Sequence, residues 1–120
     1  MALSEKEIAE IKEELRRCSP ETVAAALRFR ETGDVTAVPE VIYGLVELYT
    51  PATAKIPLKD ANDDTRLVDD LGLDSLSLLE MVFSIEGVLK IKIENEELKE
   101  VLTIGKLNQF LRDKLANGAL

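Results

Sequence analysis

Apolar residues spaced three and four positions apart recur along this chain, and most such stretches are bounded by residues that begin or stop a helix. This spacing places apolar side chains on one face of an α-helix, whereas a half-buried strand requires strict alternation. The segment Lys90–Glu94 does alternate like a strand, but no second convincing strand exists to pair with it. The pattern therefore predicts an all-α fold, a bundle of helices around one core.

Capping residues give the bounds of the expected helices. Ser4 and Glu7 have the spacing of a capping box, and Ser19 and Pro20 supply the cap and the first-turn proline of a second helix. Asp74 is expected to cap a strongly apolar helix. The expected helices are Glu5–Cys18, Pro20–Thr32, Val38–Tyr49, Ser75–Val88 and Ile104–Leu115, with a short helical turn at Asn95–Val101 and a stop at Asn117-Gly118.

The predicted helices differ in the apolar surface that they can bury. Residues 5–18 present a clear stripe, whereas residues 20–32 offer a thin face of Val23, Ala26 and Leu27. The helix over residues 75–88 has five residues that are expected to face inward. They are Leu76, Leu79, Val82, Phe83 and Ile85.

The loop Thr50–Leu73 is long for so small a domain, and a loop of this kind usually has a function. Its aspartates are expected to stay in solvent, while Leu67 and Leu71 are expected to fold inward.

Charge and composition exclude several classes of function. The chain has 15 basic and 23 acidic residues, a net charge of −8, which argues against nucleic-acid binding because phosphate contacts need a basic surface. It has no histidine and one cysteine, Cys18, so no metal site, disulfide or histidine-activated nucleophile is expected. No apolar run is long enough to span a membrane, no signal peptide is visible, and the reducing cytoplasm is the expected compartment.

The stretch Asp69–Leu76 reads Asp-Asp-Leu-Gly-Leu-Asp-Ser-Leu, and here the chain resembles the acyl carrier protein family. Asp74-Ser75-Leu76 matches the attachment motif of that family, and Leu102–Gly105, before the last helix, also fits. The resemblance covers about Val38 to Leu115. It implies a four-helix bundle, three main helices and one short one, over residues 37–120. Residues 1–36 would then be an N-terminal extension of about two additional helices.

The resemblance implies that Ser75 is esterified by 4′-phosphopantetheine from coenzyme A, which a separate transferase delivers. A serine in the first turn of a helix points to solvent, and the helix N-terminus favours a phosphodiester. Asp74 is expected to cap the helix and to help orient a divalent ion during transfer, and Leu76 is expected to anchor the turn from beneath. No base lies beside Ser75 in sequence, so the chain is not expected to be an enzyme.

The resemblance also implies an acidic surface that meets basic docking patches on acyl-processing enzymes. Glu80, Glu86, Asp69 and Asp70 are the candidate recognition residues, while Ser77 occupies a position where many fatty-acid carriers have another acid. The excess of flexible apolar residues predicts that an acyl chain shelters inside the bundle, between the helices over 38–49 and 75–88. The predicted pocket is lined by Leu79, Val82, Phe83, Ile42 and Val46.

These observations predict a discrete, specialised and monomeric acyl carrier protein of fatty acid, lipid or polyketide-type biosynthesis. Two alternatives stay open: a carrier of aminoacyl groups, and a helical interaction module that carries nothing. Residues 1–36 are expected to cover the bundle, and the competing hypothesis makes them a docking or dimerising element.

Overall fold

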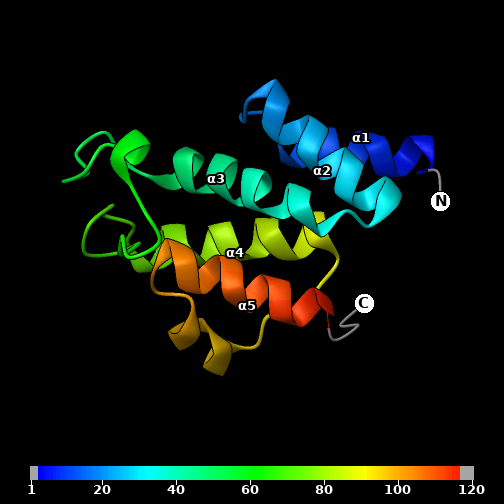
Figure 1. The fold of residues 1–120 in the computed structure, drawn as a ribbon. Coiled ribbons are helices and arrows are strands. Elements are labelled where there is room, and N and C mark those ends of the chain that lie inside the picture. Colours follow the sequence, from blue (N-terminus) through cyan, green and yellow to red (C-terminus); the bar gives the residue numbers. More distant parts are fainter. Residues whose placement is uncertain (1–2, 117–120) are drawn as a thin grey trace.

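The computed structural model describes residues 3–116, which contain helices and no strand, so the all-α prediction is confirmed (Figure 1). The α-helices are α1 (Glu5–Glu14), α2 (Pro20–Thr32), α3 (Val38–Tyr49), α4 (Ser75–Leu89) and α5 (Ile104–Ala116). Three short 3-10 segments join them: η1 (Val35–Ala37), η2 (Leu58–Asp60) and η3 (Asn95–Glu100).

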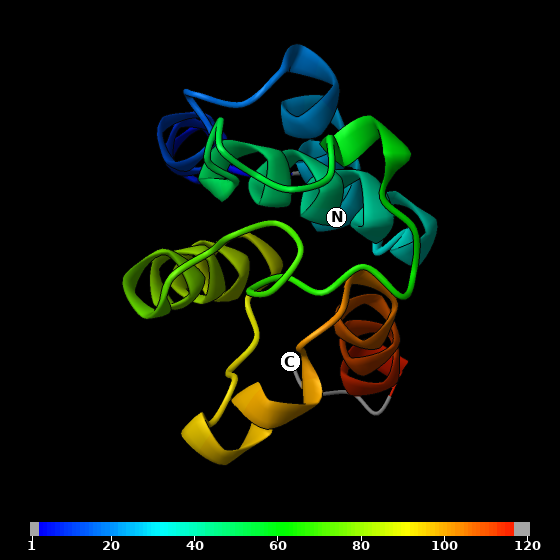
Figure 2. The same cartoon turned by 90° about the vertical axis from the view of Figure 1, so that its left-hand side faces the viewer.

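The helices form two layers. Figure 2 shows α1, α2 and α3 in one layer, and α4 and α5 in the other. α3 and α4 run in opposite directions, so the end of α3 and the start of α4 lie at the same end of the bundle (Figure 1). α2 contacts both α3 and α4, and α1 contacts α2 and α4. The N-terminal extension is therefore packed onto the helices that the resemblance assigns to the carrier.

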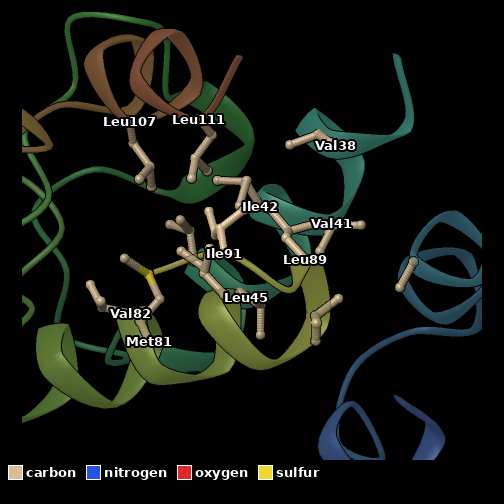
Figure 3. Packing of buried hydrophobic residues seen from close by; sticks show 14 of the residues in the cluster. Val38, Val41, Ile42, Leu45, Met81, Val82, Leu89, Ile91, Leu107 and Leu111 are labelled. Atoms are coloured by element: carbon tan, nitrogen blue, oxygen red, sulfur yellow. The ribbon is translucent and has the colours of Figure 1, made fainter. Parts of the chain in front are cut away.

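The core lies where α3, α4 and α5 meet (Figure 3). Each of these helices buries a stripe of aliphatic side chains, because burial of apolar surface is the main favourable term in folding. The labelled core residues are Val38, Val41, Ile42, Leu45, Met81, Val82, Leu89, Ile91, Leu107 and Leu111. Leu67 and Leu71 from the long loop are fully buried, as predicted.

The α-helix bounds agree with the prediction except at three C-terminal ends, one of them that of α5, which ends one residue late at Ala116. α1 ends at Glu14, four residues early, because Ser19 must be extended ahead of Pro20 and the chain needs a turn to reach it. Cys18 lies in that turn, and burial raises the pKa of its thiol. α4 ends one residue late, at Leu89. The predicted stop at residues 117–118 lies outside the described residues.

The buried face of α2 differs from the predicted one. Thr22, Ala25, Ala26 and Phe29 are buried, whereas the predicted Val23 and Leu27 are only half-buried. The reason is close packing on α3, since a Cβ atom on Gly44 would lie 2.1 Å from Thr22 Oγ1. Small side chains allow the backbones of α2 and α3 to approach closely. The few apolar residues of α2 are then sufficient to pack it against α3.

One arginine links three helices. Arg30 of α2 donates from Nη2 to Glu7 Oε2 of α1 at 3.0 Å and from Nη1 to the Val88 carbonyl of α4 at 3.3 Å. Its side chain is 9% exposed, so the guanidinium is held within the structure. These contacts fit the covering role expected of residues 1–36. The boundary between residues 36 and 37 stays a prediction.

Among the described residues, no helix has the length and apolar character needed to cross a membrane.

The surroundings of Gly44 and Gly87 predict that alanine substitutions at these two glycines have opposite effects on the free energy of unfolding. Gly44→Ala should destabilise the protein by about 1–3 kcal/mol, because the added methyl overpacks the α2–α3 contact. Gly87→Ala in α4 meets nothing within 4 Å and should stabilise it by up to about 1 kcal/mol. Urea unfolding followed by circular dichroism measures both, and equal effects of the two substitutions would contradict the packing described.

Candidate functional site

Ser75 is the first residue of α4, and its side chain is exposed. Two buried leucines hold the chain in front of it, since Leu71 is 0% and Leu73 1% exposed. Gly72 between them has a φ of 81°, a left-handed conformation that glycine adopts without steric cost. The turn before α4 is thus anchored on the core side, and Ser75 emerges on the solvent side.

Asp74 is the N-cap of α4, as predicted. Its Oδ1 accepts a hydrogen bond from the Ser77 N–H at 2.7 Å. That hydrogen bond, with a smaller contribution from the Ser77 hydroxyl, lowers the pKa of Asp74 below its ordinary value. The carboxylate therefore stays charged at the start of the helix, where the helix dipole also favours a negative charge. The structure assigns Asp74 the capping role; its role toward a divalent ion stays a prediction.

The predicted role of Leu76 is wrong. Leu76 is 67% exposed, and it lies on the solvent face of α4 together with Leu79 and Phe83. Turning 100° per residue, α4 points these three away from the side that carries Met81 and Ile85. Leu71 and Leu73 anchor the turn instead.

The predicted pocket residues do not lie on one side of α4. Ile42, Val46 and Val82 are at most 3% exposed, whereas Leu79 is 37% and Phe83 63% exposed. Phe83 was expected to face inward, and that expectation is wrong for the same reason of helical phase. Of the five residues predicted to line an acyl pocket between α3 and α4, only Ile42, Val46 and Val82 are therefore buried.

The four candidate recognition acids divide into two pairs. Glu80 and Asp69 are exposed, and Asp69 Oδ2 forms an ion pair with Arg66 Nη1 at 3.4 Å. Asp70 accepts hydrogen bonds from the Arg66 guanidinium and, with a smaller effect, from the Arg66 backbone N–H, and both lower the pKa of Asp70. Glu86 Oε2 accepts the Ile93 N–H at 2.8 Å. Asp70 and Glu86 therefore hold the local structure, whereas Asp69 and Glu80 are the more exposed of the four acids.

Sequence reasoning missed Arg66, which organises the loop that leads to Ser75. Besides holding Asp70, it pairs with Thr103 across an isolated β-bridge, and the neighbouring Leu67 N–H donates to the Leu102 carbonyl at 2.9 Å. The sequence signal was the pair Arg66 and Asp70, four residues apart within a loop. Such a pair predicts an interaction only if the loop folds back into a turn between the two residues. The loop is thereby fixed to the start of α5.

The surroundings of Ser75 fit a bulky phosphodiester. The hydroxyl is exposed, makes no hydrogen bond within the described residues, and lies at a helix N-terminus that favours an anion. No group of three or more metal-ligating side chains occurs in the described part of the chain.

The Asp74 cap predicts a pH-dependent contribution to the stability of the unmodified protein. Because the folded state lowers this pKa, the contribution is complete above the ordinary value of 3.8 and is lost as the pH falls through the folded pKa. Asp74→Ala should therefore unfold at a lower urea concentration at neutral pH, and the difference should shrink in acid. Asp74→Asn, which keeps the acceptor, is the matched control. A deficit in Asp74→Ala that persists unchanged in acid would contradict the charged cap.

Comparison with known proteins identifies the family. The family model described as "Phosphopantetheine attachment site" matches residues 52–111. An acyl carrier protein of Acidothermus cellulolyticus is 35% identical over 72 residues, 60% of this chain and 84% of that protein. An acyl carrier protein of Desulforapulum autotrophicum is 32% identical over 59 residues, 49% of this chain and 77% of that protein.

A third relative has a more specific name. The anthracycline acyl carrier protein DpsG of Streptomyces peucetius is 42% identical over 59 residues, 49% of this chain and 70% of that protein. No solved structure matches the chain. The matched segment contains Ser75 and its flanking turn, on a fold that presents that serine to solvent. The chain therefore belongs to the acyl carrier protein family, whose members carry a covalently attached 4′-phosphopantetheine.

Proposed function

We propose that this chain is a specialised acyl carrier protein and that Ser75 is its attachment site. The observation that carries the proposal is the exposed hydroxyl of Ser75 in the first turn of α4, within the family match. The serine lies in an Asp-Ser-Leu sequence, and its turn is fixed by Leu71, Leu73 and the Asp74 cap.

The residues of the chain present the hydroxyl rather than activate it. Ser75 Oγ attacks the pantetheine-bearing phosphate of coenzyme A, the P–O bond of the pyrophosphate bridge breaks, and adenosine 3′,5′-bisphosphate leaves. The serine proton passes to a base of the transferase, because no described side chain hydrogen-bonds this hydroxyl. The start of α4 then stabilises the resulting phosphodiester through its dipole. When bound, the arm supplies a terminal thiol that holds acyl groups as thioesters. The chain has no catalytic role in this proposal.

The small number of exposed acids near Ser75, Asp69 and Glu80, supports a restricted set of partners. With Asp70 and Glu86 engaged internally, Asp69 and Glu80 are left to attract a basic docking patch. We infer that the partners are the transferase and a dedicated group of acyl-processing enzymes. Two of the relatives reported above are named an acyl carrier protein and an anthracycline acyl carrier protein. Fatty acid, lipid and polyketide-type biosynthesis in the cytoplasm are the proposed settings.

Intact-mass measurement tests the attachment site. After incubation with coenzyme A and a phosphopantetheinyl transferase, the wild type should gain the mass of one phosphopantetheine. Ser75→Ala should gain none while its circular dichroism is unchanged. Ser77→Ala, two residues further along α4, is the control and should gain it. A helical module that carries nothing would gain no mass in any variant, and modification of Ser75→Ala would place the arm elsewhere.

Electrostatic docking predicts a selective effect at Glu80. Glu80→Lys should slow association with the transferase several-fold at low salt, and added salt should reduce the difference. Glu40→Lys, the same charge change at the exposed start of α3, is the control for net charge. Stopped-flow association rates measure the effect. Equal slowing by both substitutions would mean that only the total charge matters.

A further inference from the structure

The segment just before Ser75 is a compact turn that its own backbone closes. The Leu71 N–H donates to the Arg66 carbonyl at 3.1 Å. The Leu73 N–H donates to the Leu67 carbonyl, also at 3.1 Å. The turn leads directly into α4, whose first residue is Ser75. The direction in which Ser75 leaves the turn therefore depends on how the base of the turn is held.

Backbone hydrogen bonds fix the base of this turn, Arg66 and Leu67, to the start of α5. The Leu67 N–H donates to the Leu102 carbonyl at 2.9 Å, and the Ile104 N–H donates to the Thr65 carbonyl at 3.0 Å. The long loop accordingly reaches the start of α5 in Figure 1. Because α5 itself packs on α3, the base of the turn rests on the body of the bundle.

Asp70 joins this fixed base to the part of the turn that leads to Ser75. Its Oδ2 accepts hydrogen bonds from the Arg66 N–H at 2.8 Å and from Arg66 Nε at 3.3 Å, and its Oδ1 accepts one from Arg66 Nη2 at 3.2 Å. The Asp70 side chain is 19% exposed, against 65% for the neighbouring Asp69. A carboxylate with both oxygens engaged and little exposed surface is better placed to hold the turn than to meet a cation of a partner.

We propose that Asp70, acting through Arg66, is a positioning residue for the modification of Ser75. The inference rests on the proposed attachment to Ser75, and it gives Asp70 no contact with the transferase. Leu71 and Leu73 hold the turn against the core, while the pair of Asp70 and Arg66, the Arg66 clamp, fixes it on the side of α5. Phosphoryl transfer needs the attacking oxygen in line with the leaving oxygen. Since a misplacement of about 1 Å can slow a reaction roughly a hundredfold, a loosened turn should slow the chemical step.

The charge of Arg66 separates this role from direct recognition of the transferase by Asp70. The Arg66 side chain is 58% exposed, so it adds a cation to a surface that is proposed to meet a basic patch. If Asp70 acts by attracting that patch, removal of the Arg66 charge leaves docking unchanged or speeds it. If Asp70 acts through the clamp, removal of either side chain slows the same chemical step.

The test follows modification of the full chain by coenzyme A and a phosphopantetheinyl transferase. Intact mass first establishes that the wild type is modified, so failure of the proposed attachment is seen before the inference is tested. Single-turnover rates with the transferase in saturating excess then measure the chemical step, and stopped-flow mixing measures association. Asp70→Ala removes all three hydrogen bonds and should slow the chemical step about tenfold. Arg66→Met keeps the backbone hydrogen bond and should slow that step about threefold.

The double variant should be no slower than Asp70→Ala alone, because both substitutions remove one shared interaction. Arg66→Lys keeps an ion pair and should restore part of the rate lost in Arg66→Met. Asp60→Ala removes the same charge from an exposed position of the loop and should leave the chemical step unchanged.

Circular dichroism shows whether each variant is folded at the assay temperature. If Asp70→Ala does not fold, Arg66→Met carries the test, because the Arg66 side chain is exposed. An unchanged chemical step in Arg66→Met would overturn the proposal. Slowed association with an unchanged chemical step in Asp70→Ala would make Asp70 a recognition acid and also overturn it. Single effects that multiply in the double variant would do the same, since they would show that the two side chains act separately.

Discussion

The burial of one side of α4 is the constraint on which the rest of the structure depends. Met81, Ile85 and Leu89 are completely buried, and α4 contacts α1, α2 and α3. Because the packed side fixes the rotation of the helix about its axis, it also fixes which residues face solvent. Ser75, Leu79 and Phe83 are exposed for that reason.

The two ends of α4 are held by different interactions. At the start, the Asp74 cap and the buried Leu73 hold the turn that presents Ser75. At the end, Arg30 of the extension donates to the Val88 carbonyl, and Lys90 takes a left-handed conformation with a φ of 57°. Since the last carbonyls of a helix lack partners within it, the extension satisfies one of them. The helix that carries the proposed site is thus stabilised by residues outside the family match.

Much of the fold was predictable because caps and periodicity are local signals. The Ser4–Glu7 capping box, the Ser19 and Asp74 caps and the whole of α3 lie where the sequence placed them. Apart from the early end of α1, the main errors concern side-chain direction. Leu76 and Phe83 are as apolar as their buried neighbours, so composition alone could not tell that the buried side of α4 excludes them. The Gly44–Thr22 contact and the Arg66 clamp join residues whose proximity depends on tertiary packing.

The site itself was predictable where it depends on a short motif and unpredictable where it depends on the loop. The Asp74 cap and the exposed position of Ser75 in the first turn of α4 could be predicted from the motif and its place before an apolar helix. The engagement of Asp70 and Glu86 could not, because both acids look solvent-exposed until the segments that they contact are placed. Of the four predicted recognition acids, Asp69 and Glu80 are therefore the two that remain exposed.

We propose above all that, in its host, the chain carries an acyl group through an arm on Ser75. Top-down mass spectrometry of the intact protein, purified from its host without reducing agents, tests this most directly. The predicted result is a phosphopantetheine that fragment ions assign to Ser75, with an acyl thioester on part of the population. A host protein that carries no phosphopantetheine, or carries it on another residue, would contradict the account.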